Sequence, residues 1–197
     1  MFSGIIEEIG CVEKIETLAQ SKKFAISCKK VLSDVLIGDS ISVNGVCLTV
    51  TNIENNLFYV DIIQETLNRS NLGNLDYQSN VNLERAMVYN QRVSGHLVQG
   101  HVDTQAEVIN INRTDEWTEI DFLIEPKFKK YCIEKGSIAI DGVSLTIASI
   151  SDLGIKVALI PHTLSNTILS GYQLKQKVNI ETDMVGKFIE NFSGIIN

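Results

Sequence analysis

The sequence lacks the marks of several common protein classes. Its formal charge is −7, and its lysine clusters are short and diluted by acidic residues. Nucleic-acid-binding proteins normally carry a clustered basic stripe, because phosphate contacts dominate their affinity, so we expect no nucleic-acid partner. No apolar run approaches the roughly 20 residues of a membrane span, and two glutamates stand where a signal peptide needs basic residues. We therefore expect a cytoplasmic protein with reduced thiols and no membrane partner.

Common catalytic and metal-binding motifs are also missing. The chain has no GxGxxG, P-loop, GxSxG or HExxH pattern, so dinucleotide, phosphate, hydrolase and zinc-protease sites of those types have no support. The three histidines lack paired metal-ligand spacing, and the four cysteines form no CxxC motif. We therefore expect no metal site.

An internal repeat is the main feature that the sequence does contain. Residues 41–50 read ISVNGVCLTV and residues 138–147 read IAIDGVSLTI, an offset of 97 with five of ten positions identical. The same offset aligns VNLE at 81–84 with VNIE at 178–181. Two copies are too few for a solenoid, so the chain is predicted to be a duplicated domain with its boundary near residues 87–95.

Each copy has the pattern of a β-structure. Segments 40–53, 57–63, 137–150 and 154–160 are rich in Val, Ile and Thr and are separated by Asn, Gly and Asp turns. About six short strands in each copy, closed on themselves, would bury one face and leave no free edge.

Helices are predicted at three places. Short helices are expected near residues 28–35 and 126–134, the second with a proline near its start. The tail has apolar residues at near-helical spacing: Val185, Phe188, Ile189, Phe192 and Ile196. This stripe must pack either on its own barrel or against another subunit, and the sequence leaves both open.

The two copies differ where a ligand could bind. Four aligned pairs carry different chemistry: Cys47 and Ser144, Asn44 and Asp141, Ile5 and His101, and Gly38 and Lys135. Each difference also has a structural interpretation, since Cys47 can be core filler, Ser144 can bond its own backbone, and Asp141 can be a turn residue. His101 is the strongest single candidate, because glycines around it let a ligand approach the backbone. His96 is as easily a structural histidine.

Seven blocks occur in a characteristic order: MFSGI, NGVCLTV, ETLNRSNLG, VNLERAM, SGHLVQGHVD, KGSIAIDGVSLTI and VNIETDM. Together they resemble the riboflavin synthase family over essentially the whole chain. The resemblance implies an all-β fold of two tandem homologous six-stranded Greek-key barrels plus a C-terminal helix. It implies a lumazine-binding barrel at 1–90, a second at 91–183, and an oligomer-contact helix at 184–197.

The resemblance also implies an activity. Members of the family are transferases of riboflavin biosynthesis. They react two molecules of 6,7-dimethyl-8-ribityllumazine, one of which donates a four-carbon unit to the other. The products are riboflavin and 5-amino-6-ribitylamino-pyrimidinedione, and no cofactor takes part. We expect a homotrimer whose active site lies between the first barrel of one subunit and the second barrel of its neighbour, and an association with lumazine synthase.

Two sets of substrate-binding residues follow from the family's motifs. The first pocket would be lined by Gly4, Ile5, Ile6, Cys47, Leu48, Thr49, Asp61, Ile62, Ile63, Gln64, Glu65 and Thr66. The second would be lined by Gly100, His101, Val102, Lys135, Ser144, Leu145, Thr146, Ile160, Pro161, His162 and Thr163. Backbone groups of the two repeated strands suit the donors and acceptors of a pteridine edge, and Glu65, Thr66 and Thr163 would bond ribityl hydroxyls. One departure is His162, which stands where the family usually has the glutamate that the first copy keeps as Glu65.

For the chemistry, the family points to a small group of residues: Ser40, Cys47, His101, Asp141, Ser144 and Asp183. We expect His101 to move the proton of the acidic 7-methyl group of the donor, since histidine is the side-chain type that changes charge near neutral pH. Cys47 or Ser40 would assist addition at the neighbouring ring carbon.

Two other functions fit parts of the sequence. Relatives in luminous bacteria keep the double barrel and bind a lumazine or flavin as a fluorophore, but they typically lose the pattern that SGHLVQGHVD keeps here. An FAD-binding barrel of a reductase would need a following nicotinamide domain, for which this chain has no sequence. The enzyme remains the preferred interpretation.

Overall fold

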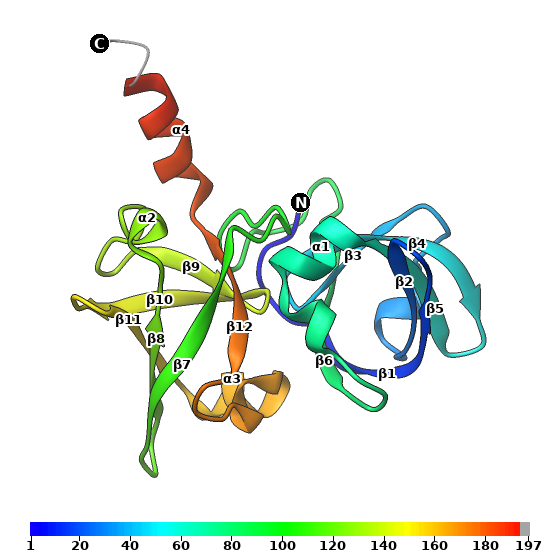
Figure 1. Ribbon diagram of the computed structural model, residues 1–197, viewed down its shortest axis with the longest axis horizontal. Coiled ribbons are helices and arrows are strands. Elements are labelled where there is room, and N and C mark those ends of the chain that lie inside the picture. Colours follow the sequence, from blue (N-terminus) through cyan, green and yellow to red (C-terminus); the bar gives the residue numbers. More distant parts are fainter. Residues whose placement is uncertain (194–197) are drawn as a thin grey trace.

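The computed structural model describes residues 1–193 of the 197-residue chain. The described part forms two closed antiparallel barrels that lie beside each other, and helix α4 projects from the second (Figure 1). The first barrel is built from β1 (Glu8–Thr17), β2 (Ser21–Ser27), β3 (Ser40–Val43), β4 (Val46–Glu54), β5 (Leu57–Ile63) and β6 (Asn80–Arg85). The second is built from β7 (Thr104–Arg113), β8 (Thr118–Leu123), β9 (Ser137–Ile140), β10 (Val143–Ile150), β11 (Gly154–Leu159) and β12 (Lys177–Thr182).

Strand order confirms the predicted all-β fold of two six-stranded barrels. The strands close as β1-β2-β5-β4-β3-β6 and as β10-β11-β8-β7-β12-β9, in which equivalent strands are neighbours in both repeats; only the starting point and the direction of reading differ. The predicted strand segments 57–63 and 137–150 coincide with β5 and with the β9–β10 hairpin. The domain limits at residues 90 and 183 stay a prediction.

The helices differ from the prediction in length and place. They are α1 (Gln64–Arg69), α2 (Pro126–Lys129), α3 (Pro161–Asn166) and α4 (Met184–Ser193), with 3-10 turns at Val31–Ser33, Asn71–Asn74 and Ile168–Gly171. The expected helix at 28–35 is only a 3-10 turn, and α2 begins at the predicted proline but is short. Helix α4 agrees with the predicted tail helix, although Ile196 lies outside the described residues. No helix within residues 1–193 has the length and apolar character needed to span a bilayer.

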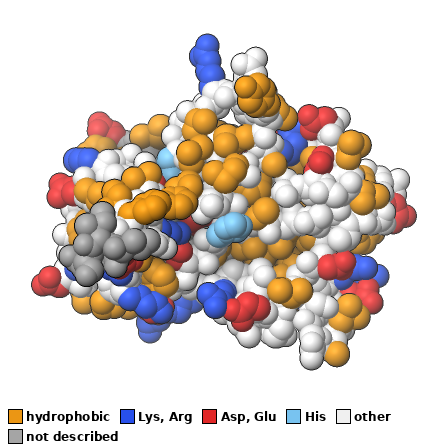
Figure 2. Space-filling model, turned by 90° about the horizontal axis from the view of Figure 1, so that it is seen from above, with side chains coloured by type: hydrophobic (Ala, Val, Ile, Leu, Met, Phe, Trp, Pro, Cys, Tyr) orange, Lys and Arg blue, Asp and Glu red, His pale blue; other side chains and the backbone are white. Residues whose placement is uncertain are grey.

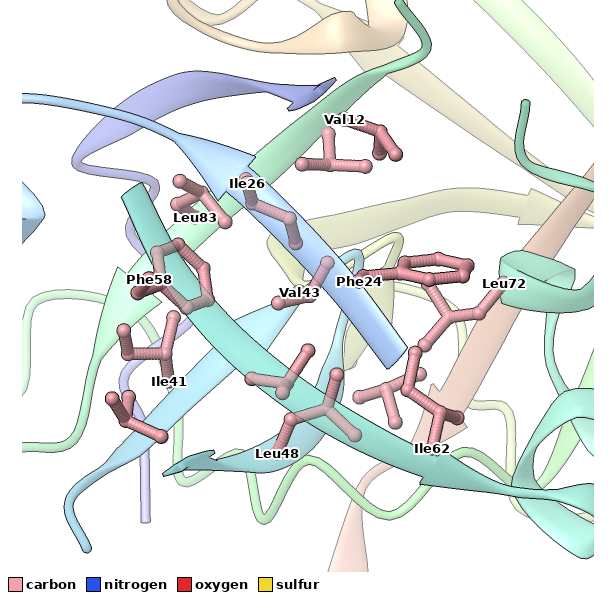
Figure 3. Packing of buried hydrophobic residues seen from close by; sticks show 14 of the residues in the cluster. Val12, Phe24, Ile26, Ile41, Val43, Leu48, Phe58, Ile62, Leu72 and Leu83 are labelled. Carbon is pink, nitrogen blue, oxygen red and sulfur yellow. The ribbon is translucent and has the colours of Figure 1, made fainter. Parts of the chain in front are cut away.

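A packed hydrophobic core occupies the interior of each barrel. In the first barrel, Phe24, Ile41 and Phe58 are fully buried and converge from three different strands (Figure 3). The second barrel has an equivalent cluster around Phe122 and Ile140. Interiors packed in this way are filled by side chains, so a ligand can bind only on the outer surfaces of the barrels.

The two barrels meet at matching hairpin turns. Asn44 and Gly45 join β3 to β4, and Asp141 and Gly142 join β9 to β10, all four with φ between 43° and 80°. Two consecutive residues with positive φ define a type I′ turn, which Asn-Gly and Asp-Gly sequences favour. A Cβ placed on Gly45 would lie 2.7 Å from the backbone nitrogen of Gly142. The glycines therefore permit the close contact of the two turns.

Asp141 accepts several hydrogen bonds at the interface between the two barrels. Its side chain is 0% exposed and accepts hydrogen bonds from the Tyr172 hydroxyl at 2.6 Å, the Asn179 backbone at 2.7 Å and the Asn71 side chain at 2.9 Å. Asn71 belongs to the first repeat, so the carboxylate ties the barrels together. This position does not support the predicted catalytic role of Asp141, because three protein donors occupy the carboxylate in a site closed to solvent. We assign Asp141 to the barrel interface.

Stability should depend on pH through Asp141. Burial raises the pKa of Asp141 to about 7, while the hydrogen bonds from Tyr172, Asn179 and Asn71 oppose this shift. A carboxyl whose pKa is higher in the folded than in the unfolded state binds its proton more tightly when folded, so stability falls as pH rises from about 4 to about 7. Between pH 5 and pH 8 we expect a loss of about 2–3 kcal/mol in the free energy of unfolding.

The matched variant is Asp141→Asn, because Asn44 occupies the equivalent turn of the first repeat with nearly the same φ. Asparagine cannot titrate in this range, so the share of the pH dependence that comes from Asp141 should be lost in this variant. Urea denaturation of both proteins at pH 5 and pH 8 measures the difference. Equal pH dependence in the two proteins would assign the effect to other groups.

Candidate functional site

The segments that precede the two barrels are exchanged between them. Phe2 and Val98 form a reciprocal bridge, with N–H···O distances of 2.7 and 3.0 Å. Beyond this bridge, the Gly4 carbonyl accepts a hydrogen bond from the Ser144 backbone of the second barrel at 2.7 Å. The Gly100 carbonyl accepts one from the Cys47 backbone of the first barrel at 2.9 Å.

Side-chain packing follows the same exchange. Ile6 packs against the core cluster of the second barrel, and Val102 packs against that of the first. Gly4 and Gly100 have φ of 75° and 80°, and a Cβ on either would lie 2.6 Å from the Cβ of the facing residue. Glycine is therefore required at both contacts, because each segment crosses the opposite barrel with its backbone against a strand.

This exchange corrects the grouping of the predicted site residues. The sequence interpretation placed Gly4, Ile5 and Ile6 with Cys47, and Gly100, His101 and Val102 with Ser144. In the structure His101 follows a glycine bonded to β4, and Ile5 follows a glycine bonded to β10. Two surface regions result. The first-barrel region combines Gly100, His101 and Val102 with Cys47, Leu48, Thr49 and residues 61–66. The second-barrel region combines Gly4 and Ile6 with Ser144, Leu145, Thr146, Lys135 and residues 160–163, while Ile5, the residue between them, lines a groove formed by residues 3–94.

Each region contains a strand edge that the barrel leaves uncovered over a few residues. Strand β4 pairs with β3 through Cys47 and Thr49, but its pairing with β5 starts only at Val50. The Cys47 N–H points away from β3, toward Gly100. Backbone groups of residues two apart in a strand point to the same side, so those of Thr49 share this direction. Strand β10 is built in the same way, since its pairing with β11 starts at Ile147.

Side chains alternate between the two faces of a strand, and this alternation determines which predicted residues can present a side chain to a ligand. Leu48 and Ile62 point into the barrel core, where they are 6% and 1% exposed (Figure 3). A ligand on the outer surface can therefore meet only their backbone groups. Cys47 is half-buried and Thr49 exposed, as expected for strand residues that alternate with core positions. Ser144 and Thr146 repeat this arrangement in the second barrel.

The two regions differ in their titratable groups. In the second-barrel region the His96 Nδ1 atom lies 2.7 Å from the Ser144 hydroxyl oxygen. Burial lowers the pKa of His96, and the nearby charge of Asp183 opposes this shift. Depending on its tautomer, a neutral imidazole either accepts a hydrogen bond from the serine hydroxyl or donates one to it. The sequence leaves a functional and a structural role for His96 equally open, and its contact with a residue 48 positions away has no signal in the sequence.

Several other predicted residues lie around these regions. Ser40 pairs with Thr49 across β3 and β4, and it lines a groove of about 510 Å³ together with Ile5, Arg85 and Arg92. Asp183 accepts a hydrogen bond from the Val185 backbone at the start of α4. The exposed residues Ile63, Gln64, Ile160, Pro161 and His162 belong to the ends of β5 and β11 and to the helices that follow.

The helices α1 and α3 hold the residues expected to bind ribityl hydroxyls. Glu65 on α1 is exposed and forms an ion pair with Arg69. Thr66 and Thr163 are half-buried, and their carbonyls accept hydrogen bonds from the hydroxyls of Ser70 and Thr167. The hydroxyls of both threonines have no hydrogen-bond partner within residues 1–193, so they are open to a ligand.

The thiols and acidic side chains of residues 1–193 form neither disulfides nor a metal-binding cluster. All four cysteines are free thiols. Burial raises the pKa of Cys28 to about 12 and that of Cys132 to about 11, so neither is a reactive thiolate at neutral pH. Among the described residues, no group of three or more His, Cys, Asp or Glu side chains is placed to hold a metal ion.

Comparison with protein families gives two matches within the chain. A family model described as the lumazine binding domain matches residues 3–86 and, a second time, residues 99–183. The chain is 46% identical over 192 residues to riboflavin synthase of Bacillus subtilis strain 168, covering 98% of this chain and 89% of that protein. It is 42% identical over 197 residues to riboflavin synthase of Mycobacterium tuberculosis strain H37Rv, covering 96% of both.

Solved structures with the same fold carry ligands. LumP complexed with riboflavin superposes with a TM-score of 0.88 at 27% identity, covering 93% of this chain and 100% of LumP. LumP complexed with 6,7-dimethyl-8-(1'-D-ribityl) lumazine superposes with a TM-score of 0.84 at 29% identity, covering 93% and 99%. The fold is therefore one on which lumazine and flavin ring systems bind in another protein.

Proposed function

The chain belongs to the riboflavin synthase family of lumazine-binding domain proteins, and from this premise we propose that it converts two molecules of 6,7-dimethyl-8-ribityllumazine into riboflavin and 5-amino-6-ribitylamino-pyrimidinedione. One molecule donates a four-carbon unit and the other accepts it. The observation that carries the proposal is the pair of like strand edges with unlike side chains. Cys47 and the His101 segment flank one edge, while Ser144 and His96 flank the other.

Backbone recognition explains how one substrate can bind twice. The Cys47 and Ser144 N–H groups are taken by the Gly100 and Gly4 carbonyls, but beyond them the edges of Cys47–Thr49 and Ser144–Thr146 offer further N–H and C=O groups, which match the donors and acceptors along a pteridine edge. The threonine hydroxyls of α1 and α3 would bond the ribityl chains, because a buried hydroxyl left unpaired costs roughly 1–3 kcal/mol. Identical backbones thus accept identical ring systems.

The side chains that differ between the two regions have different roles in the proposed reaction. His101 removes a proton from the 7-methyl group of the donor lumazine, and Cys47 or Ser40 assists addition at the neighbouring ring carbon. Ser144, which is hydrogen-bonded to a neutral His96, lies beside the ring system bound at the second barrel. Holding the two rings in a reactive arrangement supplies a further part of the rate, because well-oriented partners no longer pay the entropy of encounter.

One assay tests the reaction. The purified protein is incubated with 6,7-dimethyl-8-ribityllumazine alone, and riboflavin is followed by its absorbance and by chromatography. We expect one riboflavin for two lumazines consumed, with no added cofactor. Tight binding without turnover would contradict the proposal and favour a ligand-carrying protein similar to LumP.

Assembly into a homotrimer completes the proposal. The apolar residues of α4 are Val185, Phe188, Ile189 and Phe192, each at least 52% exposed. The face seen from above gathers hydrophobic side chains around histidine between the barrels (Figure 2). Such a patch marks a protein contact, and a trimer would place the first-barrel region of one subunit opposite the second-barrel region of the next.

Sedimentation equilibrium should give three times the chain mass of 21.9 kDa; a monomer would overturn this part of the proposal. Cosedimentation tests the predicted association with lumazine synthase.

A further inference from the structure

The loop that carries His101 is held by a buried carboxylate of the second barrel. Glu181, on β12, is 3% exposed. Its Oε1 accepts the backbone N–H of Gln99 at 2.6 Å, and its Oε2 accepts those of Gly100 at 2.8 Å and His101 at 3.0 Å. Three successive N–H groups can converge on one anion because Gly100 has positive φ, which gives the loop the form of an anion-binding nest.

A second carboxylate holds the other end of this loop. Asp103 accepts hydrogen bonds from the backbone and the hydroxyl of Thr182, both at 2.8 Å, and it pairs with Lys187 of α4 at 2.6 Å. Residues 99–103 belong to no helix or strand. The position of His101 therefore depends on Glu181 and Asp103 together with two backbone hydrogen bonds, from Cys47 to the Gly100 carbonyl at 2.9 Å and from Asp103 to the Ile180 carbonyl at 2.8 Å.

The first repeat contains an equivalent buried carboxylate, but the loop that it holds leads to a different side chain. Glu84 is 4% exposed and accepts hydrogen bonds from the Ser3 backbone at 2.7 Å and the Gly4 backbone at 3.0 Å. The loop held by Glu84 leads to Ile5, whose side chain cannot transfer a proton. Each carboxylate lies in one barrel, while the segment that it holds runs over the strand edge of the other.

We infer that Glu181 is a positioning residue that sets His101 against the first-barrel strand edge. The inference rests on the proposed function, in which His101 transfers the proton. Glu84 matches Glu181 in burial and in the backbone groups that it binds, so it reports the cost of losing such a carboxylate without moving His101. The two glutamates therefore form a natural pair of test and control.

The test is a pair of double-mutant cycles, Glu181→Gln with His101→Ala and Glu84→Gln with His101→Ala. Glutamine offers one acceptor oxygen and an NH₂ group, so at least one loop N–H faces another donor and the loop shifts. A shift near 1 Å can cost about 100-fold in rate, so we expect E181Q to lower kcat by about 10- to 100-fold with KM changed by less than about threefold. In the H101A background E181Q should add almost nothing, whereas E84Q and H101A should multiply.

The outcomes separate the inference from the proposed function. The wild-type protein is assayed first, and a wild type that makes no riboflavin refutes the proposed function. If the wild type is active and the losses of E181Q and H101A multiply, Glu181 serves stability only and the inference is wrong. If E181Q does not fold, Glu181→Asp takes its place, since the shorter side chain keeps the charge but cannot reach all three N–H groups. We expect a loss of about three- to tenfold in kcat that disappears in the H101A background; a loss that persists there overturns the inference.

Discussion

Replacing His101 by alanine should lower kcat by about 10²- to 10⁴-fold, the range typical of a lost general acid–base group. The residue follows Gly100, whose carbonyl is bonded to the Cys47 backbone, so the imidazole belongs to the surface where the first ring system would lie. Its side chain is exposed, and the substitution leaves no cavity in a core. The loss should therefore appear in turnover, measured as riboflavin formed under saturating lumazine, with little change in thermal stability.

His101→Gln is the informative companion. Glutamine can still form hydrogen bonds with a ligand but cannot exchange a proton near neutral pH, so we expect it to be about as slow as alanine. Recovery of most of the rate with glutamine would assign His101 to binding. A loss below about tenfold in both variants would mean that holding the two rings together supplies nearly all of the rate.

Replacing Gly100 by alanine should damage both stability and activity. Its φ is +80°, which costs an L-residue about 1–2 kcal/mol, and the new Cβ would lie 2.6 Å from the Cβ and 2.8 Å from the nitrogen of Cys47. Overpacking of this kind typically costs a further 1–3 kcal/mol. We expect the free energy of unfolding to fall by roughly 2–5 kcal/mol, and kcat to fall by about 100-fold because the His101 loop must move away from β4.

Gly38→Ala provides the control for backbone strain. Gly38 also has positive φ, +98°, but no atom lies within 4 Å of a Cβ placed there. Alanine at this position should cost only the strain, about 1–2 kcal/mol. Urea denaturation of both variants separates the two contributions, and equal losses would contradict the steric argument at Gly100.

The repeat and its strands were accessible to sequence reasoning for physical reasons. Matched blocks at a constant offset gave the duplication, and Asn44-Gly45 and Asp141-Gly142 are the dipeptides that a type I′ hairpin requires. The helices α1 and α3 were missed because six residues are too few to establish a helical period. The turn role of Asp141 was open to sequence reasoning, but its interface role was not, because its partner Asn71 lies 70 positions away in the other repeat, where no sequence signal connects the two.

The grouping of the site residues was beyond the sequence. The repeat aligns the segment at Gly4 with the segment at Gly100, but equivalent positions in two copies say nothing about which barrel each segment touches. Both arrangements bury the same apolar residues, since Ile6 and Val102 would meet a hydrophobic core in either case. The exchange is visible only in three dimensions, in the hydrogen bonds from Ser144 and Cys47 and in the packing of Ile6 and Val102.

That exchange also sets the order in which the molecule can be finished during synthesis. The segment around Gly4 leaves the ribosome long before the strand to which it docks, because Ser144 follows 140 positions later. At about 5–20 residues per second, this separation corresponds to roughly 7–28 s. The first barrel can close within that time, but the residues that precede it stay exposed to solvent until the second repeat has been translated.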